Sequence, residues 1–273
     1  MNTRTPKKSF LGGFCVSTLG GLIGLGGAEF RLPLLVGYFG FGTLLAVMIN
    51  KLTSLFTVFF SLSFRTFYMG YMDIYTNFST VIVLLFGSMI GAWLGAHYAC
   101  LLKEHSLNKL IAFILIILSI SMISSHVFNV GLYHNAALSG VSLYLAGLIA
   151  GIIIGVIAAV LGVAGGEFLI PTLMLLYGFD MKVAGTLSLY ISLPTMLVAF
   201  FRYSKDRAFT EMLRHKQFMV YMILGSLAGS LFGAYSLKYV NSEWLVWILG
   251  VILMISAIKV FTHSKKSSEP VKN

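Results

Sequence analysis

Residues 24–33 read GLGGAEFRLP, and residues 162–171 read GVAGGEFLIP. The second stretch lies 138 positions after the first, and both place a glutamate and a proline at the same points behind a run of glycines. Glycine raises the entropic cost of a helix and proline removes a backbone donor, so each stretch predicts an interruption between helices. Within a membrane such a break is tolerated only where protein or a water-filled cavity satisfies the freed backbone groups. The pair therefore indicates a buried site.

The composition excludes an ordinary soluble protein. Hydrophobic residues make up 58% of the 273 positions, charged residues only 10%, and the mean hydropathy is +0.91. A soluble domain carries about 25% charged residues, so we expect an all-α integral membrane protein in the lipid bilayer. The net charge of +10 comes from tails and short loops, without a nucleic-acid motif, so nucleic acid is not an expected partner.

Eight apolar segments approach the roughly 20 residues that a membrane-spanning helix needs. Two shorter runs, 30–41 and 168–179, follow the glycine stretches; as helices they would reach only about 18 Å, so broken or re-entrant segments are expected there. The correspondence at 138 positions continues through these segments without a gap. The eight long segments lie at residues 10–28, 43–64, 78–102, 108–125, 142–165, 183–201, 216–237 and 244–261.

Lysine and arginine residues predict how the segments cross the membrane. They gather in the N-terminal tail, between residues 202 and 216, and in the C-terminal tail, so all three are expected in the cytoplasm. Each half then carries an odd number of segments, and the two repeats have inverted topology, as in many secondary transporters. The expected organisation is a tail at 1–8, a first repeat at 9–126, an extracytoplasmic link at 127–141, a second repeat at 142–262 and a tail at 263–273.

Glu29 and Glu167 are the strongest candidates for chemistry. A carboxylate at mid-membrane costs about 2.5–3.5 kcal/mol even on insertion scales, and it is a functional hypothesis by default. Burial favours the protonated form, which makes both residues candidate proton carriers. The alternative is structural, with each glutamate accepting hydrogen bonds from exposed backbone N–H groups of a broken helix across the interface between the two halves.

The glycine stretches themselves are candidate anion-binding elements. Backbone N–H groups at the N-terminus of a half-helix favour an anion without a dedicated cation. Gly26 and Gly27 in the first half, with Gly165 and Gly166 in the second, are expected to present such groups to a small anionic substrate.

Polar residues near the breaks add further candidates. Arg31 and Lys51 occur only in the first half, where either could neutralise an anion, pair with Glu29 or snorkel to the cytoplasmic interface. Small polar groups on the helix after each short segment could line a binding pocket; interhelical hydrogen bonding is the alternative. The residues of this last kind are Asn50, Thr53 and Ser54 in the first half and Thr186, Ser188, Tyr190 and Ser192 in the second.

No cofactor or metal is expected. The two cysteines, Cys15 and Cys100, lie in apolar segments without the spacing of a metal site or a disulfide framework. No P-loop, nucleotide-binding glycine fingerprint or hydrolase motif occurs, so any transport would draw on a gradient rather than on ATP.

The doubled glycine-rich motif resembles the sulfite exporter TauE/SafE family, also called the toluene-sulfonate uptake permease family. The resemblance includes the Gly-Phe pair at Gly40 and Gly178 and the glycine-spaced fourth segment of each half, and it covers about residues 9–261. It implies a permease of the inner cell membrane that moves sulfite, sulfonates or other sulfur-containing or organic anions.

These observations favour a secondary transporter for a small anion. It would work by alternating access between the inverted halves, with Glu29 and Glu167 as candidates for proton coupling. Two alternatives stay open at this point: a channel, and a non-transporting subunit of a membrane complex. An enzyme is not expected, because two symmetry-related glutamates take the place of a set of catalytic groups.

Overall fold

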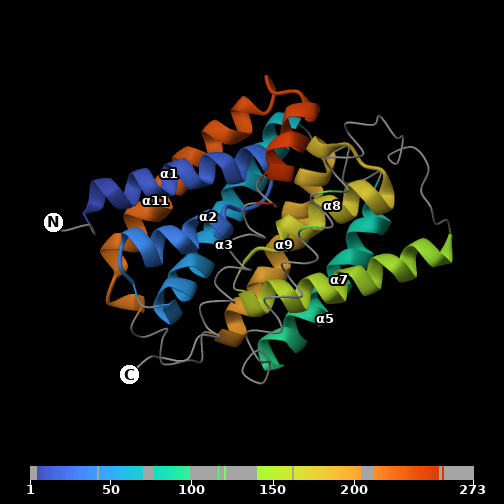
Figure 1. Cartoon of the computed structure of the whole chain (residues 1–273), viewed down its shortest axis with the longest axis horizontal. Helices are drawn as coiled ribbons and strands as arrows, with labels where there is room; N and C mark the ends of the chain where they lie inside the picture. Colours follow the sequence, from blue (N-terminus) through green and yellow to red (C-terminus); the bar gives the residue numbers. More distant parts are fainter. Residues whose placement is uncertain are drawn as a thin grey trace.

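The computed structural model describes residues 5–41, 43–69, 77–98, 116, 120, 140–161, 163–203, 212–251 and 254. Within these ranges every regular element is a helix (Figure 1). The first half contains α1 (Pro6–Ile23), α2 (Ala28–Pro33), the π-helix η1 (Leu34–Tyr38), α3 (Thr43–Met69) and α5 (Phe78–Tyr98). The second contains α7 (Val141–Leu161), α8 (Gly166–Tyr177), α9 (Met181–Tyr203) and α11 (Lys216–Ser236).

Both predicted helix breaks are present. The predicted end of segment 10–28 is wrong, because α1 stops at Ile23. Gly24 follows with φ 98°, a left-handed conformation that favours glycine and ends the helix. The segment predicted to reach residue 165 likewise ends at Leu161. The short run 30–41 is divided between α2 and η1, whereas its counterpart α8 is one continuous helix.

Two tight helix pairs flank the molecule, α1 with α11 and α5 with α7 (Figure 1). Glycines make the close approach possible, as expected for small residues at spacing four. A Cβ on Gly91 would collide with the carbonyl oxygen of Ile152, and one on Gly229 with the carbonyl oxygen of Phe14. Gly229 lies 138 positions after Gly91, and Ile152 lies 138 after Phe14. Equivalent residues therefore form both interfaces, and each interface joins the two halves.

Replacing Gly229 by leucine is expected to lower the melting temperature of the purified protein by roughly 5 °C or more. The side chain would have to displace the α1 backbone, and such overpacking costs about 1–3 kcal/mol. Gly37→Ala is the control, since a Cβ there meets nothing within 4 Å. Equal melting temperatures for the two variants, measured in detergent, would contradict the described interface.

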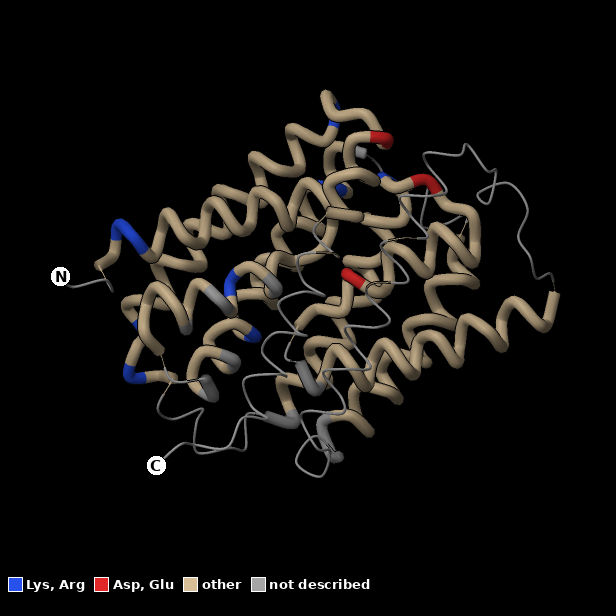
Figure 2. Tube along the Cα trace, viewed as in Figure 1, with Lys and Arg blue, Asp and Glu red and all other residues tan. Residues whose placement is uncertain are grey.

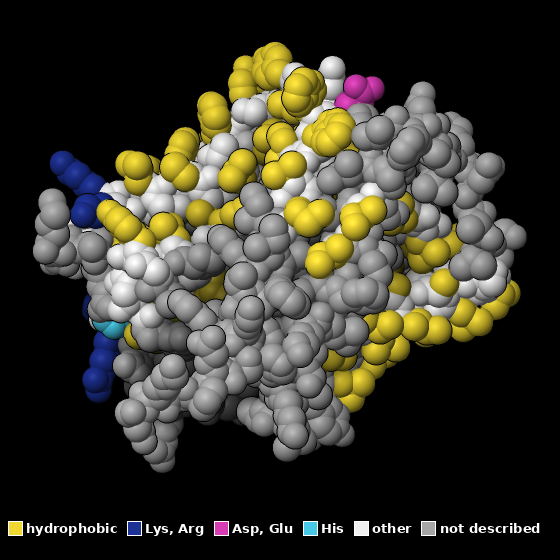
Figure 3. Space-filling view, viewed as in Figure 1, with side chains coloured by type: hydrophobic (Ala, Val, Ile, Leu, Met, Phe, Trp, Pro, Cys, Tyr) yellow, Lys and Arg dark blue, Asp and Glu magenta, His cyan; other side chains and the backbone are white. Residues whose placement is uncertain are grey.

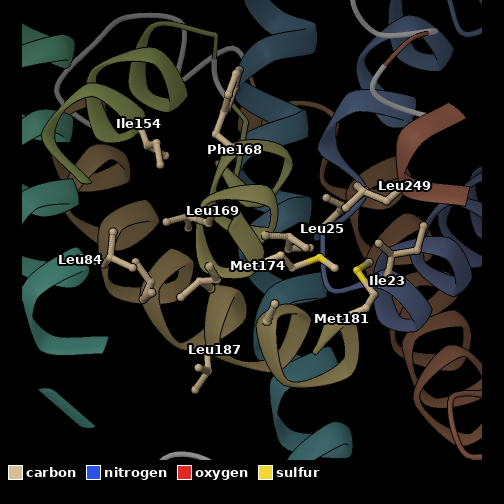
Figure 4. Close-up of a cluster of buried hydrophobic side chains, with 14 of the residues drawn as sticks. Ile23, Leu25, Leu84, Ile154, Phe168, Leu169, Met174, Met181, Leu187 and Leu249 are labelled. Atoms are coloured by element: carbon tan, nitrogen blue, oxygen red, sulfur yellow. The ribbon is translucent and has the colours of Figure 1, made fainter. Parts of the chain in front are cut away.

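The long helices α3 and α9 pass between the two pairs and contact each other. An apolar cluster fills the space around α8 and α9 and draws on both halves (Figure 4). Ile23 and Leu25 contribute from the end of α1 and the first break, and Leu84 from α5, while Phe168 and Leu187 contribute from α8 and α9. The cluster therefore holds the first break against the second half.

Four described helices are long and apolar enough to cross a membrane: α5, α7, α9 and α11. Their outer faces expose large apolar side chains such as Phe86, Trp93 and Ile149, and apolar side chains cover much of the described surface in Figure 3. Charged positions are sparse along the helices (Figure 2). Most of the predicted span 108–125 and the end of 244–261 lie outside the described residues, although an apolar helix occupies Ser242–Val251.

Candidate functional site

The two glycine-rich breaks, far apart in the sequence, meet inside the molecule. A Cβ on Gly26 would lie 3.3 Å from the Cβ of Ala164, the residue at the equivalent position of the second half. A Cβ on Gly166 would lie 3.0 Å from Leu25 Cα. Since neither approach leaves room for a larger residue, small residues at these points let the breaks touch.

Each half-helix starts at a glycine in the left-handed region. Gly27, with φ 74°, precedes α2, and Gly165, with φ 82°, precedes α8. Neither glycine can cap its helix with a side chain, and Gly26 also has a positive φ of 81°. The four predicted glycines are therefore all part of the two breaks.

Arg31 is a fully enclosed cation at the breaks, with an exposed fraction of 0%. Its Nη1 donates to Ser54 Oγ at 2.7 Å, and its Nη2 donates to Thr57 Oγ1 at 2.8 Å and to Ser17 Oγ at 3.2 Å. The helix α2 supplies the arginine, while α1 and α3 supply the hydroxyls. These bonds hold the guanidinium beside the first break in a fixed orientation.

Asn50 and Lys51 lie next to each other on α3 and contact opposite halves. Asn50 Nδ2 donates to the carbonyl oxygen of Ala28 at 3.1 Å, which ties α3 to the start of α2. Lys51 Nζ donates to the carbonyl oxygen of Ala159, near the end of α7, at 3.3 Å. Its side chain is only 4% exposed, so it is buried between the halves and does not snorkel to an interface.

The two candidates on α9 differ in what they contact. Ser188 Oγ lies 2.9 Å from the carbonyl oxygen of Gly24, at the first break, and 2.9 Å from that of Gly185. Thr186 Oγ1 donates to the carbonyl oxygen of Lys182 on its own helix at 2.9 Å. The structure thus brings Ser188 to the break, while the Thr186 hydroxyl is bonded within α9.

Replacing Ser188 by alanine is expected to destabilise the protein by about 1–3 kcal/mol, because the buried Gly24 carbonyl loses a donor. The measurement is the melting temperature in detergent. Ser63→Ala serves as the control, since this exposed hydroxyl donates to the carbonyl oxygen of Phe59 on its own helix. If both variants melt at the same temperature, the Ser188 contact does not hold the break.

Glu167 lies in the first turn of α8 and is 4% exposed. The glutamate at the equivalent position, Glu29, is the second residue of α2; its side chain falls outside what the structure describes. The role of these two carboxylates in proton coupling stays a prediction. Among the described residues no group of three or more histidine, cysteine, aspartate or glutamate side chains could hold a metal ion.

Sequence reasoning missed two of the hydroxyls around Arg31, those of Ser17 and Thr57. A periodic signal could have found Thr57. Polar residues occur along α3 at successive spacings of four, three, four and four, which places them on one helical face. These residues are Asn50, Ser54, Thr57, Ser61 and Arg65, and all five have an exposed fraction of 0%.

Comparison with known proteins gives one result. The family described as Sulfite exporter TauE/SafE matches the chain over residues 9–260. No curated protein and no solved structure matches it.

Proposed function

Because the chain belongs to the sulfite exporter TauE/SafE family, whose members are membrane transporters for sulfur anions, we propose that it is a secondary transporter for a small sulfur-containing or organic anion, such as sulfite or a sulfonate. The observation that carries the proposal is the fully buried Arg31 guanidinium, which hydroxyls from α1 and α3 hold beside the meeting point of the two breaks. The anion binds there.

The chemistry of this place suits an oxyanion. Burying a cation is costly unless charge and hydrogen bonds compensate for the lost water, and a bound anion contributes to both. A guanidinium offers planar N–H donors whose geometry matches the oxygens of sulfite or a sulfonate. Hydroxyl groups such as that of Ser54 both donate and accept, so they can orient Arg31 in the empty site and contact the anion in the loaded one.

Alternating access follows from the paired architecture in this proposal. The pairs α1 with α11 and α5 with α7 use equivalent glycines, which supports two inverted repeats related by a pseudo-twofold axis. Gly26 and Ala164 face each other across that axis. One pair moving against the other would open the breaks first to one side of the inner membrane and then to the opposite side. The termini are cytoplasmic, in agreement with the lysines of both tails.

The substrate class is tested by uptake into proteoliposomes that contain the purified protein. The panel is sulfite, thiosulfate, an alkyl sulfonate and acetate, each offered at the same concentration. We expect protein-dependent, saturable uptake of at least one of the sulfur anions and weaker uptake of acetate. Uptake that never saturates would indicate a channel, and no uptake of any anion by folded protein would contradict the proposal.

A further inference from the structure

One end of the polar face of α3 holds a second buried arginine, Arg65. It lies eight residues beyond Thr57, about 12 Å along the helix axis, and so away from the hydroxyls that hold Arg31. The equivalent position on α9 is Tyr203, and the second half therefore has no matching cation. Arg65 has an exposed fraction of 0%, so it is as enclosed as Arg31.

The guanidinium of Arg65 has unused donors. Its Nη2 lies 3.4 Å from the carbonyl oxygen of Lys182, on the first turn of α9. In the described part of the chain, Nε and Nη1 have no hydrogen-bond partner, and neither has the Oγ of Ser61. Ser61 precedes Arg65 by four residues and therefore lies on the same face of α3, one turn away. Buried polar groups without partners are rare and call for an explanation.

Two glycines make room for the Arg65 guanidinium beside the first break. A Cβ on Gly24 would lie 2.5 Å from Nη1, and one on Gly185 would lie 2.8 Å from the same atom. The charge is therefore placed between the end of α1 and the start of α9, and it contacts both halves. A purely structural role has a physical basis as well, because the C-terminus of a helix attracts a cation.

We propose that Arg65 and Ser61 form a second binding site for a small oxyanion, at the Lys182 end of the polar face and separate from the site at Arg31. The inference rests on the proposed function, because it gives an anion two successive positions along α3. The unused N–H groups of Arg65 and the Ser61 hydroxyl are the donors of this site. Arg31 with Ser54 and Thr57 forms the other.

The test counts binding sites for sodium sulfite by calorimetry on the purified full chain in detergent, under nitrogen. Wild-type protein is expected to bind two anions per chain, and Arg31→Gln is expected to retain one. Arg65→Gln is expected to lose the site at Arg65 and to retain the site at Arg31. Ser61→Ala removes a hydroxyl that has no described partner, so it should leave the melting temperature unchanged but weaken the site at Arg65 about tenfold. Ser63→Ala, on the exposed face of α3, is the matched control.

The outcomes separate this inference from the proposed function. A single site that disappears in Arg31→Gln and is unchanged in Ser61→Ala would overturn the second site and leave the transporter proposal intact. A lower melting temperature in Arg65→Gln with an unchanged number of sites would assign Arg65 a structural role only. If Arg65→Gln does not fold, the comparison of Ser61→Ala with Ser63→Ala decides, because equal affinities in these two variants overturn the inference.

Discussion

Arg31→Gln is expected to reduce the initial rate of anion uptake into proteoliposomes by about 100-fold or more. Hydrogen bonds to a charged group contribute about 1.5–3 kcal/mol each, and the variant loses both the charge and the fork of donors. The uptake rate of Arg31→Lys should fall between those of Arg31→Gln and the wild type, because lysine keeps the charge without the planar geometry. Rates are compared per amount of folded protein, as judged by gel filtration and melting temperature.

Lys7→Gln is the control for Arg31→Gln. It removes the same charge from an exposed position at the start of α1. This variant should transport at the wild-type rate, since an exposed lysine has no part in the proposed site. If Arg31→Gln takes up the anion at the wild-type rate, transport of the anion does not depend on this arginine.

Glu167→Gln is expected to abolish uptake that is driven by a pH gradient and to preserve exchange of anion for anion. Glu167 is almost fully buried in the first turn of α8, and its carboxyl group can gain and lose a proton, whereas the glutamine amide cannot. Exchange needs no net proton movement and should survive. Glu29→Gln is the matched variant at the equivalent position of the first repeat.

A structural role for these glutamates predicts a different pattern. If the carboxylate only holds the backbone of the break, Glu167→Gln should lower the melting temperature and reduce exchange and gradient-driven uptake together. Wild-type coupling in both glutamine variants would remove Glu29 and Glu167 from the mechanism.

The sequence predicted the positions of the breaks because their causes are local. Glycine tolerates the left-handed backbone at Gly24, Gly27 and Gly165, and this preference is readable from residue type alone. The 138-position repeat also predicted which helices correspond. It could not predict that α1 packs on α11, because that contact joins residues some 200 positions apart, such as Phe14 and Gly229.

The site was predicted in part for the same reason. Arg31, Asn50 and Ser188 were identifiable as polar residues in apolar surroundings, and the structure places all three at the first break. The contribution of Ser17 depends on how α1 packs beside α3, which no local pattern encodes. Not every such residue lies at the break: the Thr186 hydroxyl donates to the carbonyl oxygen of Lys182 on its own helix, as a hydroxyl in a helix can.

Uphill transport tests the central claim most directly. Proteoliposomes holding the purified chain, with equal sulfite concentrations on both sides, are given an imposed pH gradient, and the internal sulfite is followed over time in wild-type and Arg31→Gln protein. The account predicts that wild-type protein accumulates sulfite on one side, that collapsing the gradient ends the accumulation, and that Arg31→Gln shows none. Equal internal and external sulfite in every wild-type sample, from protein shown to be folded, would contradict gradient-driven transport through the Arg31 site.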